Sequence, residues 1–186
     1  MATYVFNVLK DYLANATIDL ADARIDGSTI ADGTDTSHAP IANAVFRACL
    51  IQPSSSLIAA DTNNGGTDAV DLTLCSDITT LNELDRTGYT PMTTGAEADN
   101  DWVTATLTKV TGPSGYTKWV VADLTITTVI AGQDVNGILV VWDKDDTSTN
   151  LNTKVPLVWI GLAGDISTNG GNITINWAST GLVQIA

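Results

Sequence analysis

The sequence is short of the residue types on which most catalytic and metal sites are built. His38 is the only histidine among 186 residues, so a Ser-His-Asp triad or a histidine-based metal cluster has almost nothing to build on. Eight Lys and Arg stand against 21 Asp and Glu, and the formal charge of −13 repels the phosphate backbone of nucleic acids. No apolar run approaches the ~20 residues that span a bilayer. Neither nucleic acid nor a membrane is expected as a partner.

Other familiar signals are missing as well. The opening "MATYVFNVLKDYLANA" has no basic region followed by a continuous apolar run, so we expect no secretory signal and a soluble chain made in the cytoplasm. There is no nucleophile-elbow pattern, no phosphate-binding Gly-rich loop before a helix and no paired cysteine motif, and we expect no cofactor. Cys49 and Cys75 both lie in apolar runs, which favours two buried thiols over one disulfide.

What the sequence does contain is a series of short apolar or alternating segments separated by turn residues. "NAVFRACLIQP", "DAVDLTLCSDI", "DWVTATLTKV", "TKWVVADLTITTVIAG" (one long strand or two), "GILVVW", "VPLVWIG", "NITINW" and "GLVQIA" all have strand patterns. Turn chemistry such as "NNGG", "GPSG" and "TNGGN" lies between them. Roughly eight or nine strands at this spacing predict a mainly β protein, a β-sandwich or jelly-roll-like barrel.

The N-terminal part differs from the rest. Val5, Phe6, Leu9, Tyr12 and Leu13 have helical spacing and predict one short amphipathic helix that ends near residue 15. The segment 26–40 is rich in Gly, Asp, Ser and Thr and is predicted to be a flexible loop or arm. We therefore expect residues 1–42 to form the helix plus arm and residues 43–186 the β-domain, in one folded unit.

The acidic stretch "DKDD" between "LVVW" and "PLVW" raises the question of a metal loop. An EF-hand loop that starts at Asp143 would need Gly at position 6 and Glu at position 12, where this chain has Ser148 and Lys154. Asp143, Asp145 and Asp146 are weak candidates for an unclassified cation site. A solvated hairpin loop is the favoured interpretation.

Two further chemistries compete with plain structural roles for the aromatic and acidic residues. The five Trp residues would have to share one exposed face to bind a glycan, and burial against neighbouring strands or a subunit is the favoured explanation. An enzyme that works with a pair of carboxylates is the class of catalyst that is hardest to exclude. Its candidates, which more simply form a solvated acidic face, are Glu83, Asp85, Glu97, Asp99 and Asp101. We expect no catalytic activity and no catalytic residue.

Three segments have a layout that resembles a known group of proteins. They are "LNELDRTGYTPMTTG", "VVADLTITTVIAGQDVNGILVVWDKD" and "VPLVWIGLAGDISTNGGNITINWASTGLVQIA". The layout is similar to that of small β-rich virion structural proteins of tailed bacteriophages. This chain departs from it by the 26–40 insertion and by a longer acidic region around residues 61–101.

The resemblance implies a non-enzymatic particle component located in the virion. Most favoured is a capsid decoration or cement protein that contacts the major capsid protein and copies of itself, in a symmetric oligomer such as a trimer. The alternative is a tail- or fibre-associated protein that binds a receptor glycan. Phe6, Leu9 and Leu13 could form an apolar docking stripe or equally cover the core, and Ile30 and Ile41 are further interface candidates.

Overall fold

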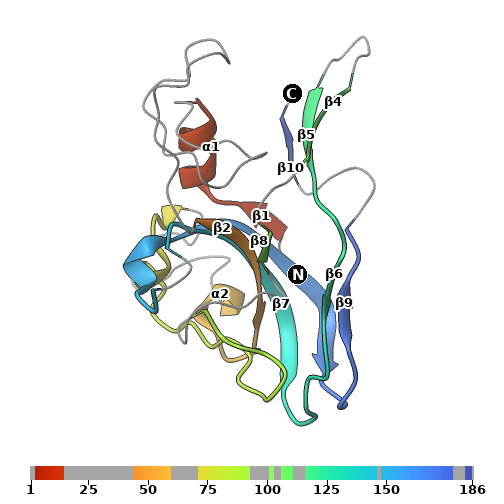
Figure 1. The fold of residues 1–186 in the computed structure, drawn as a ribbon. Helices are drawn as coiled ribbons and strands as arrows, with labels where there is room; N and C mark the ends of the chain where they lie inside the picture. Colours follow the sequence, from red (N-terminus) through yellow and green to blue (C-terminus); the bar gives the residue numbers. More distant parts are fainter. Residues whose placement is uncertain are drawn as a thin grey trace.

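A computed structural model describes residues 3–14, 44–59, 71–92, 101–102, 106–110, 116–145, 148–177 and 183–185 (Figure 1). The prediction of a mainly β protein is confirmed, and every sheet is antiparallel. The strands are β1 (Thr3–Val5), β2 (Val45–Ile51), β3 (Asp101–Trp102), β4 (Thr106–Val110), β5 (Tyr116–Val120), β6 (Leu124–Ile126), β7 (Asp134–Asp143), β8 (Lys154–Ser167), β9 (Ile173–Ile175) and β10 (Val183–Ile185).

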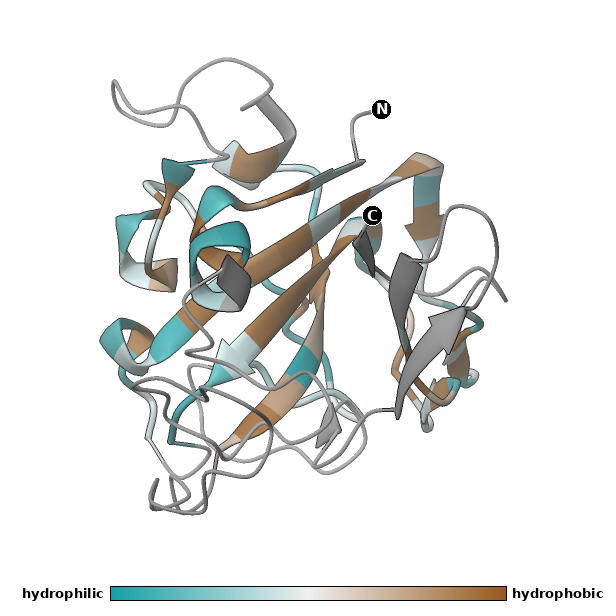
Figure 2. Cartoon of the chain, turned by 90° about the horizontal axis from the view of Figure 1, so that it is seen from above, coloured by the Kyte–Doolittle hydropathy of each residue, from teal (hydrophilic) through white to brown (hydrophobic). Residues whose placement is uncertain are grey.

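A five-stranded sheet in the order β1-β8-β7-β2-β3 forms the centre of the molecule. Every residue of β2 is buried, and β7 is buried from Val135 to Asp143, which is why both read as nearly continuous apolar runs in the sequence. Figure 2 shows hydrophobic residues concentrated along these long strands. The two strands pair from Val45 opposite Asp143 to Ile51 opposite Gly137.

The two faces of this sheet are covered differently. Phe46 packs against Trp119 of β5 with ring centroids 4.8 Å apart, so at this point one face of the sheet lies against the strand β5 of the three-stranded sheet. Because side chains alternate along a strand, Cys49 points to the opposite face, where its Sγ lies 3.8 Å from Sδ of Met92. Residues 71–92 and the short helix α2 (Ser56–Ala59) lie on that side (Figure 1).

Two predicted strands are divided in the structure. "DWVTATLTKV" forms β3 in the large sheet and β4 in the three-stranded sheet. "TKWVVADLTITTVIAG" forms β5 and β6, the second of the two alternatives, and these also belong to different sheets. The pattern of apolar residues alone did not mark where the chain leaves one sheet for the next.

The strand predicted for "DAVDLTLCSDI" is wrong over its described part, residues 71–78. The chain instead forms the 3-10 turn η2 (Cys75–Asp77). The Asp77 carboxylate accepts hydrogen bonds from the backbone N–H of Leu74 at 3.0 Å and from the Thr73 hydroxyl at 3.1 Å. A side-chain acceptor this close to the backbone competes with a strand ladder, and both Leu72 before the turn and Cys75 within it are buried.

The N-terminal helix is present but starts later than predicted. Val5 belongs to β1, which pairs with β8, and the ladder continues with the N–H of Phe6 donating to the carbonyl of Leu157 at 3.0 Å. Helix α1 (Asn7–Ala14) follows. Buried side chains of this helix and of the strands form one hydrophobic core, so the described parts of the N-terminal segment and the β-domain fold together. No helix within the described ranges has the length and apolar character to cross a membrane.

Gly137 of β7 provides a test of how tightly the central strands pack. A Cβ built there would lie 2.1 Å from Cη2 of the Trp159 ring, which is only 2% exposed and cannot move aside. We expect Gly137→Ala to lower the free energy of unfolding by about 3 kcal/mol, the upper end for overpacking a core. Urea unfolding followed by Trp fluorescence would measure it.

Gly164→Ala in β8 is the matched control, because a Cβ there meets nothing within 4 Å. We expect this variant to change stability by less than about 0.5 kcal/mol. Equal effects of the two substitutions would contradict the packing described for Gly137.

Candidate functional site

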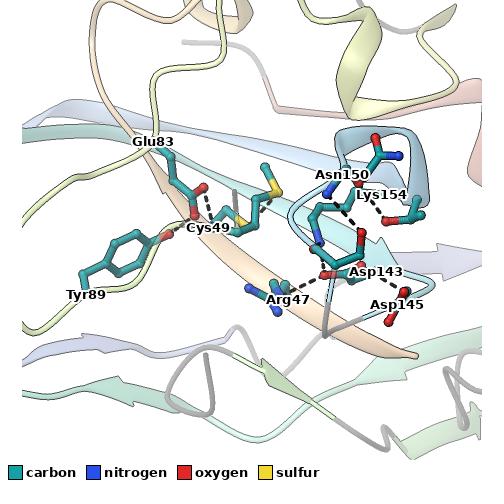
Figure 3. Close-up of polar contacts among 11 residues, drawn as sticks. Arg47, Cys49, Glu83, Tyr89, Asp143, Asp145, Asn150 and Lys154 are labelled. Atoms are coloured by element: carbon teal, nitrogen blue, oxygen red, sulfur yellow. Dashed lines mark hydrogen bonds and ion pairs between the residues drawn. The ribbon is translucent and has the colours of Figure 1, made fainter. Parts of the chain in front are cut away.

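A buried ion pair joins the two ends of the acidic hairpin. Asp143 ends β7 and Lys154 begins β8, and the two residues lie directly opposite each other in the ladder. Both side chains are fully buried. The Lys154 ammonium donates to Oδ2 of Asp143 and to the backbone carbonyl of Ser148, the latter at 2.9 Å (Figure 3).

The loop between these ends is organised around that ammonium. The N–H of Asp145 donates to Oδ1 of Asp143 at 3.2 Å, and Ser148 N–H donates to the Asp145 carbonyl at 2.9 Å. The 3-10 turn η3 (Leu151–Thr153) is capped by the Asn150 side chain, which accepts from the N–H of residue 152. The Lys154 ammonium, a cation supplied by the chain itself, therefore links the Asp143 carboxylate to the loop at Ser148.

This arrangement bears on the three weak metal candidates. The Asp143 carboxylate faces inward to the Lys154 ammonium and is engaged by it, whereas Asp145 is half-buried in the loop and Asp146 lies outside the described residues. Over the part of the chain that the structure describes, no three His, Cys, Asp or Glu side chains gather as metal ligands would.

Arg47 connects this ion pair to a second buried carboxylate. Its Nε lies 3.3 Å from Oδ2 of Asp143, and the Arg47 side chain is fully buried within β2. Burial raises the pKa of Asp143, and Lys154 and Arg47 oppose that rise. The positive charge of Arg47 also acts on Glu83, which lies on its other side in Figure 3.

Glu83 ties an irregular segment to the edge of β2. Residues 82–84 extend along this edge: Leu84 N–H donates to the Leu50 carbonyl at 2.8 Å, and Ile51 and Glu83 form an isolated bridge. The Tyr89 hydroxyl accepts from the Leu50 N–H at 3.0 Å and donates to Oε1 of Glu83. Oε2 of the same carboxylate accepts from the N–H of Met92 at 2.9 Å.

The titration of these groups reflects their burial. Burial raises the pKa of Glu83 from 4.5 to about 7, although its hydrogen bonds from Tyr89 and Met92 and the charge of Arg47 act in the opposite direction. Burial also raises the pKa of Tyr89 well above its usual value, and the neighbouring Glu83 charge adds to this effect. The Tyr89 hydroxyl therefore remains a proton donor to Glu83.

Both cysteines are free and buried, in agreement with the prediction of two thiols. Cys49 belongs to the face of β2 that carries Arg47, and Cys75 lies in η2. Burial, followed by the charge of Glu83, raises the pKa of Cys75 well above its usual value. The Cys75 thiol is therefore protonated and unreactive at neutral pH.

A pocket of about 360 Å³ lies beside Glu83. Its walls include Asp85, so two of the five candidates for a carboxylate pair line the same pocket. Glu97 and Asp99 lie outside the described residues, and nothing is described of the Asp101 side chain. A raised pKa beside a pocket is what an acid catalyst requires. However, both oxygens of Glu83 already accept hydrogen bonds from its own chain.

Of the five residues predicted as interface candidates, two are buried and the side chains of the other three are not described. Phe6 and Leu9 are fully buried in the core, so of the two alternatives these side chains cover the core rather than form an exposed stripe. The Leu13 side chain, Ile30 and Ile41 lie outside what the structure describes.

Three of the five tryptophans are buried and so contribute nothing to the exposed face that a glycan platform would need. Trp119, Trp142 and Trp159 are at most 2% exposed. Trp177 is half-buried, and nothing is described of the Trp102 side chain. Glycan stacking on the three buried rings is therefore excluded in this fold.

Sequence reasoning named Glu83 and Asp143 for other roles, and it missed the partners that fix these carboxylates, Arg47 and Tyr89. A charged residue inside the apolar run "VFRACLI" was the available signal, because a fully buried strand tolerates a guanidinium only beside a counter-charge. Comparison of the chain with protein-family models, curated proteins and solved structures found no match.

Stability should depend on pH through Glu83. Its pKa of about 7 in the folded chain exceeds the usual 4.5, so its contribution to stability is complete below pH 4.5 and is lost as the pH rises through 7. The contribution is about 3 kcal/mol, since a tenfold change in proton affinity corresponds to ~1.4 kcal/mol. Relative to Glu83→Gln, the wild-type chain should lose that amount between about pH 4.5 and about pH 8 in urea unfolding.

Asp85→Asn is the control for this measurement, because Asp85 is exposed on the same pocket. We expect wild-type and Asp85→Asn proteins to show parallel pH profiles. If the wild-type and Glu83→Gln profiles also run parallel, the Glu83 carboxyl does not titrate as described.

Proposed function

We propose that this chain is a non-enzymatic structural protein of a tailed-bacteriophage particle. Within the particle, the role we favour is that of a capsid decoration or cement protein, which stabilises the head through contacts with the major capsid protein and with copies of itself. Its place of action would be the virion, after synthesis in the host cytoplasm.

The proposal rests on one observation, the structural role of the segments that resemble virion structural proteins. The segment "LNELDRTGY" contributes Glu83 and Tyr89, whose hydrogen bonds fasten residues 82–92 to β2. Gly88 between them has a φ of +90°, and a Cβ there would lie 2.2 Å from the Thr128 carbonyl oxygen. The other two segments build β6 to β10. The residues of these segments hold the fold together, and this use supports a scaffold role for the chain.

The distribution of charge adds to this support. Among residues whose exposure is described, Lys10 is the one exposed base, and Arg47 and Lys154 are buried. The exposed acids are Asp11, Asp71, Asp77, Asp85, Asp123, Asp134 and Asp165. An acidic exterior discourages association between particles and suits contact with a basic surface of another protein.

Subunit contacts under this proposal would use apolar surface other than Phe6 and Leu9, which are buried. Ile130 and Ile166 are the large hydrophobic side chains that the described residues leave exposed, at 48% and 53%. Ile166 lies on the rim of an apolar pocket of about 200 Å³ that Ile138 of β7 and Ile173 of β9 also line. The alternative role in a tail or fibre would need the rings of Trp102 or Trp177 for a glycan, since the other three are buried.

The number of copies in each particle tests the proposal. Purified virions of the phage that encodes the chain would be analysed by quantitative mass spectrometry against the major capsid protein. A decoration protein is expected at on the order of hundreds of copies, whereas tail and neck components are present at roughly 3 to 12. A small copy number would favour the tail alternative, and absence from the particle would overturn the virion assignment.

A further inference from the structure

The contact between Lys154 and Asp143 is enforced by the sheet. The two residues are register partners on adjacent strands, and the ammonium lies in direct contact with Oδ2 of the carboxylate. Both side chains are completely shielded from solvent. Neither can swing away to water without disrupting the paired ends of β7 and β8, so the amine and the carboxyl group remain in contact for as long as the chain is folded.

The groups around this pair are placed as an acyl-transfer reaction would need them. The Ser148 carbonyl accepts a hydrogen bond from Nζ of Lys154 at 2.9 Å and so fixes the amine. The Asp145 N–H donates to Oδ1 of Asp143 at 3.2 Å, and the Arg47 guanidinium lies 3.3 Å from Oδ2. A backbone donor and a fixed positive charge directed at the two carboxyl oxygens would stabilise the oxyanion of a tetrahedral intermediate.

Burial favours condensation of the pair. A buried ion pair carries a desolvation penalty of several kcal/mol per ion, so the neutral acid and amine lie closer in energy to the ion pair than they do in water. Burial raises the pKa of Asp143, which increases the population of the reactive acid. Groups held in reacting contact reach effective concentrations of roughly 10⁵–10⁸ M. Condensation releases one water molecule, and the site from which it departs is closed to solvent.

We propose that Lys154 and Asp143 condense to an intramolecular isopeptide bond that joins the end of β7 to the start of β8. A proton passes from the ammonium to the carboxylate, and Nζ attacks Cγ of Asp143. One C–O bond then breaks as the second Nζ proton leaves with the departing oxygen. The carboxylate and ammonium become an amide and one water, with nothing oxidised or reduced.

The product keeps the hydrogen bonds of the present arrangement. The amide N–H still donates to the Ser148 carbonyl, and the amide oxygen still accepts from the Asp145 N–H. Two formal charges of opposite sign disappear from the core together, which leaves Glu83 as the carboxylate whose charge acts on Arg47. A covalent link would hold the hairpin closed under mechanical load, and it does not depend on the function proposed above.

The mass of the denatured full-length chain tests the proposal. After incubation of the folded protein at neutral pH, the wild-type chain should be lighter than its sequence by one water, once removal of Met1 is taken into account. Lys144 and Lys154 are the last two basic residues. Trypsin should therefore yield 119–144 covalently joined to 145–186, in place of separate peptides 119–144, 145–154 and 155–186.

Lys154→Arg is the matched control, because it retains a positive charge but has no amine that forms this amide. Its chain should have the full mass of its sequence. A wild-type chain at full sequence mass would overturn the proposal. So would a loss of water that persists in Lys154→Arg or maps to the Asp-Gly pairs at residues 26–27 and 32–33, which can lose water by forming a succinimide.

Discussion

The burial of Arg47 in the middle of β2 is the constraint on which the rest of the described structure depends. Every residue of this strand is buried, and an unpaired guanidinium there would destabilise the fold by several kcal/mol. The charge is balanced from two directions, by Asp143 at the end of β7 and by the field of Glu83. Each carboxylate belongs to its own segment, so balancing this one buried charge involves both the hairpin and the irregular segment that carries Glu83.

The loop that carries Glu83 shows how such a sheet is covered without a helix layer. Residues 82–84 pair with the outer edge of β2 for a short distance and leave the Leu50 N–H without a strand partner. The Tyr89 hydroxyl supplies the missing acceptor and donates in turn to Glu83. The part of β2 that lies beyond its pairing with β3 would otherwise present an open backbone group at Leu50, and a side chain satisfies it. The raised pKa of Glu83 is a consequence of this contact, since the carboxylate is removed from water in order to make it.

Much of the fold could be predicted from the sequence because burial on both faces gives continuous apolar runs. The strands around Phe46, Val140 and Val158 were predicted from such runs, and so was the hairpin between β7 and β8. The sequence could not show that the alternating segment before Cys75 leads into a 3-10 turn, because Leu72 is buried here as it would be on one face of a strand, while Cys75 is buried within the turn. The candidate site was harder to predict, because its charges come from segments far apart in the chain.

The acidic hairpin illustrates this limit most clearly. In the sequence, Lys154 counted against a calcium loop, because it stands where an EF-hand requires its closing glutamate. In the structure, the same lysine turns inward and places its ammonium against Asp143 and the Ser148 carbonyl, among the oxygen atoms that would otherwise be available to a metal ion. The residue that argued against a bound cation is therefore the cation around which the loop folds. A fixed amine in contact with a buried carboxyl can also react with it, which a metal ion could not.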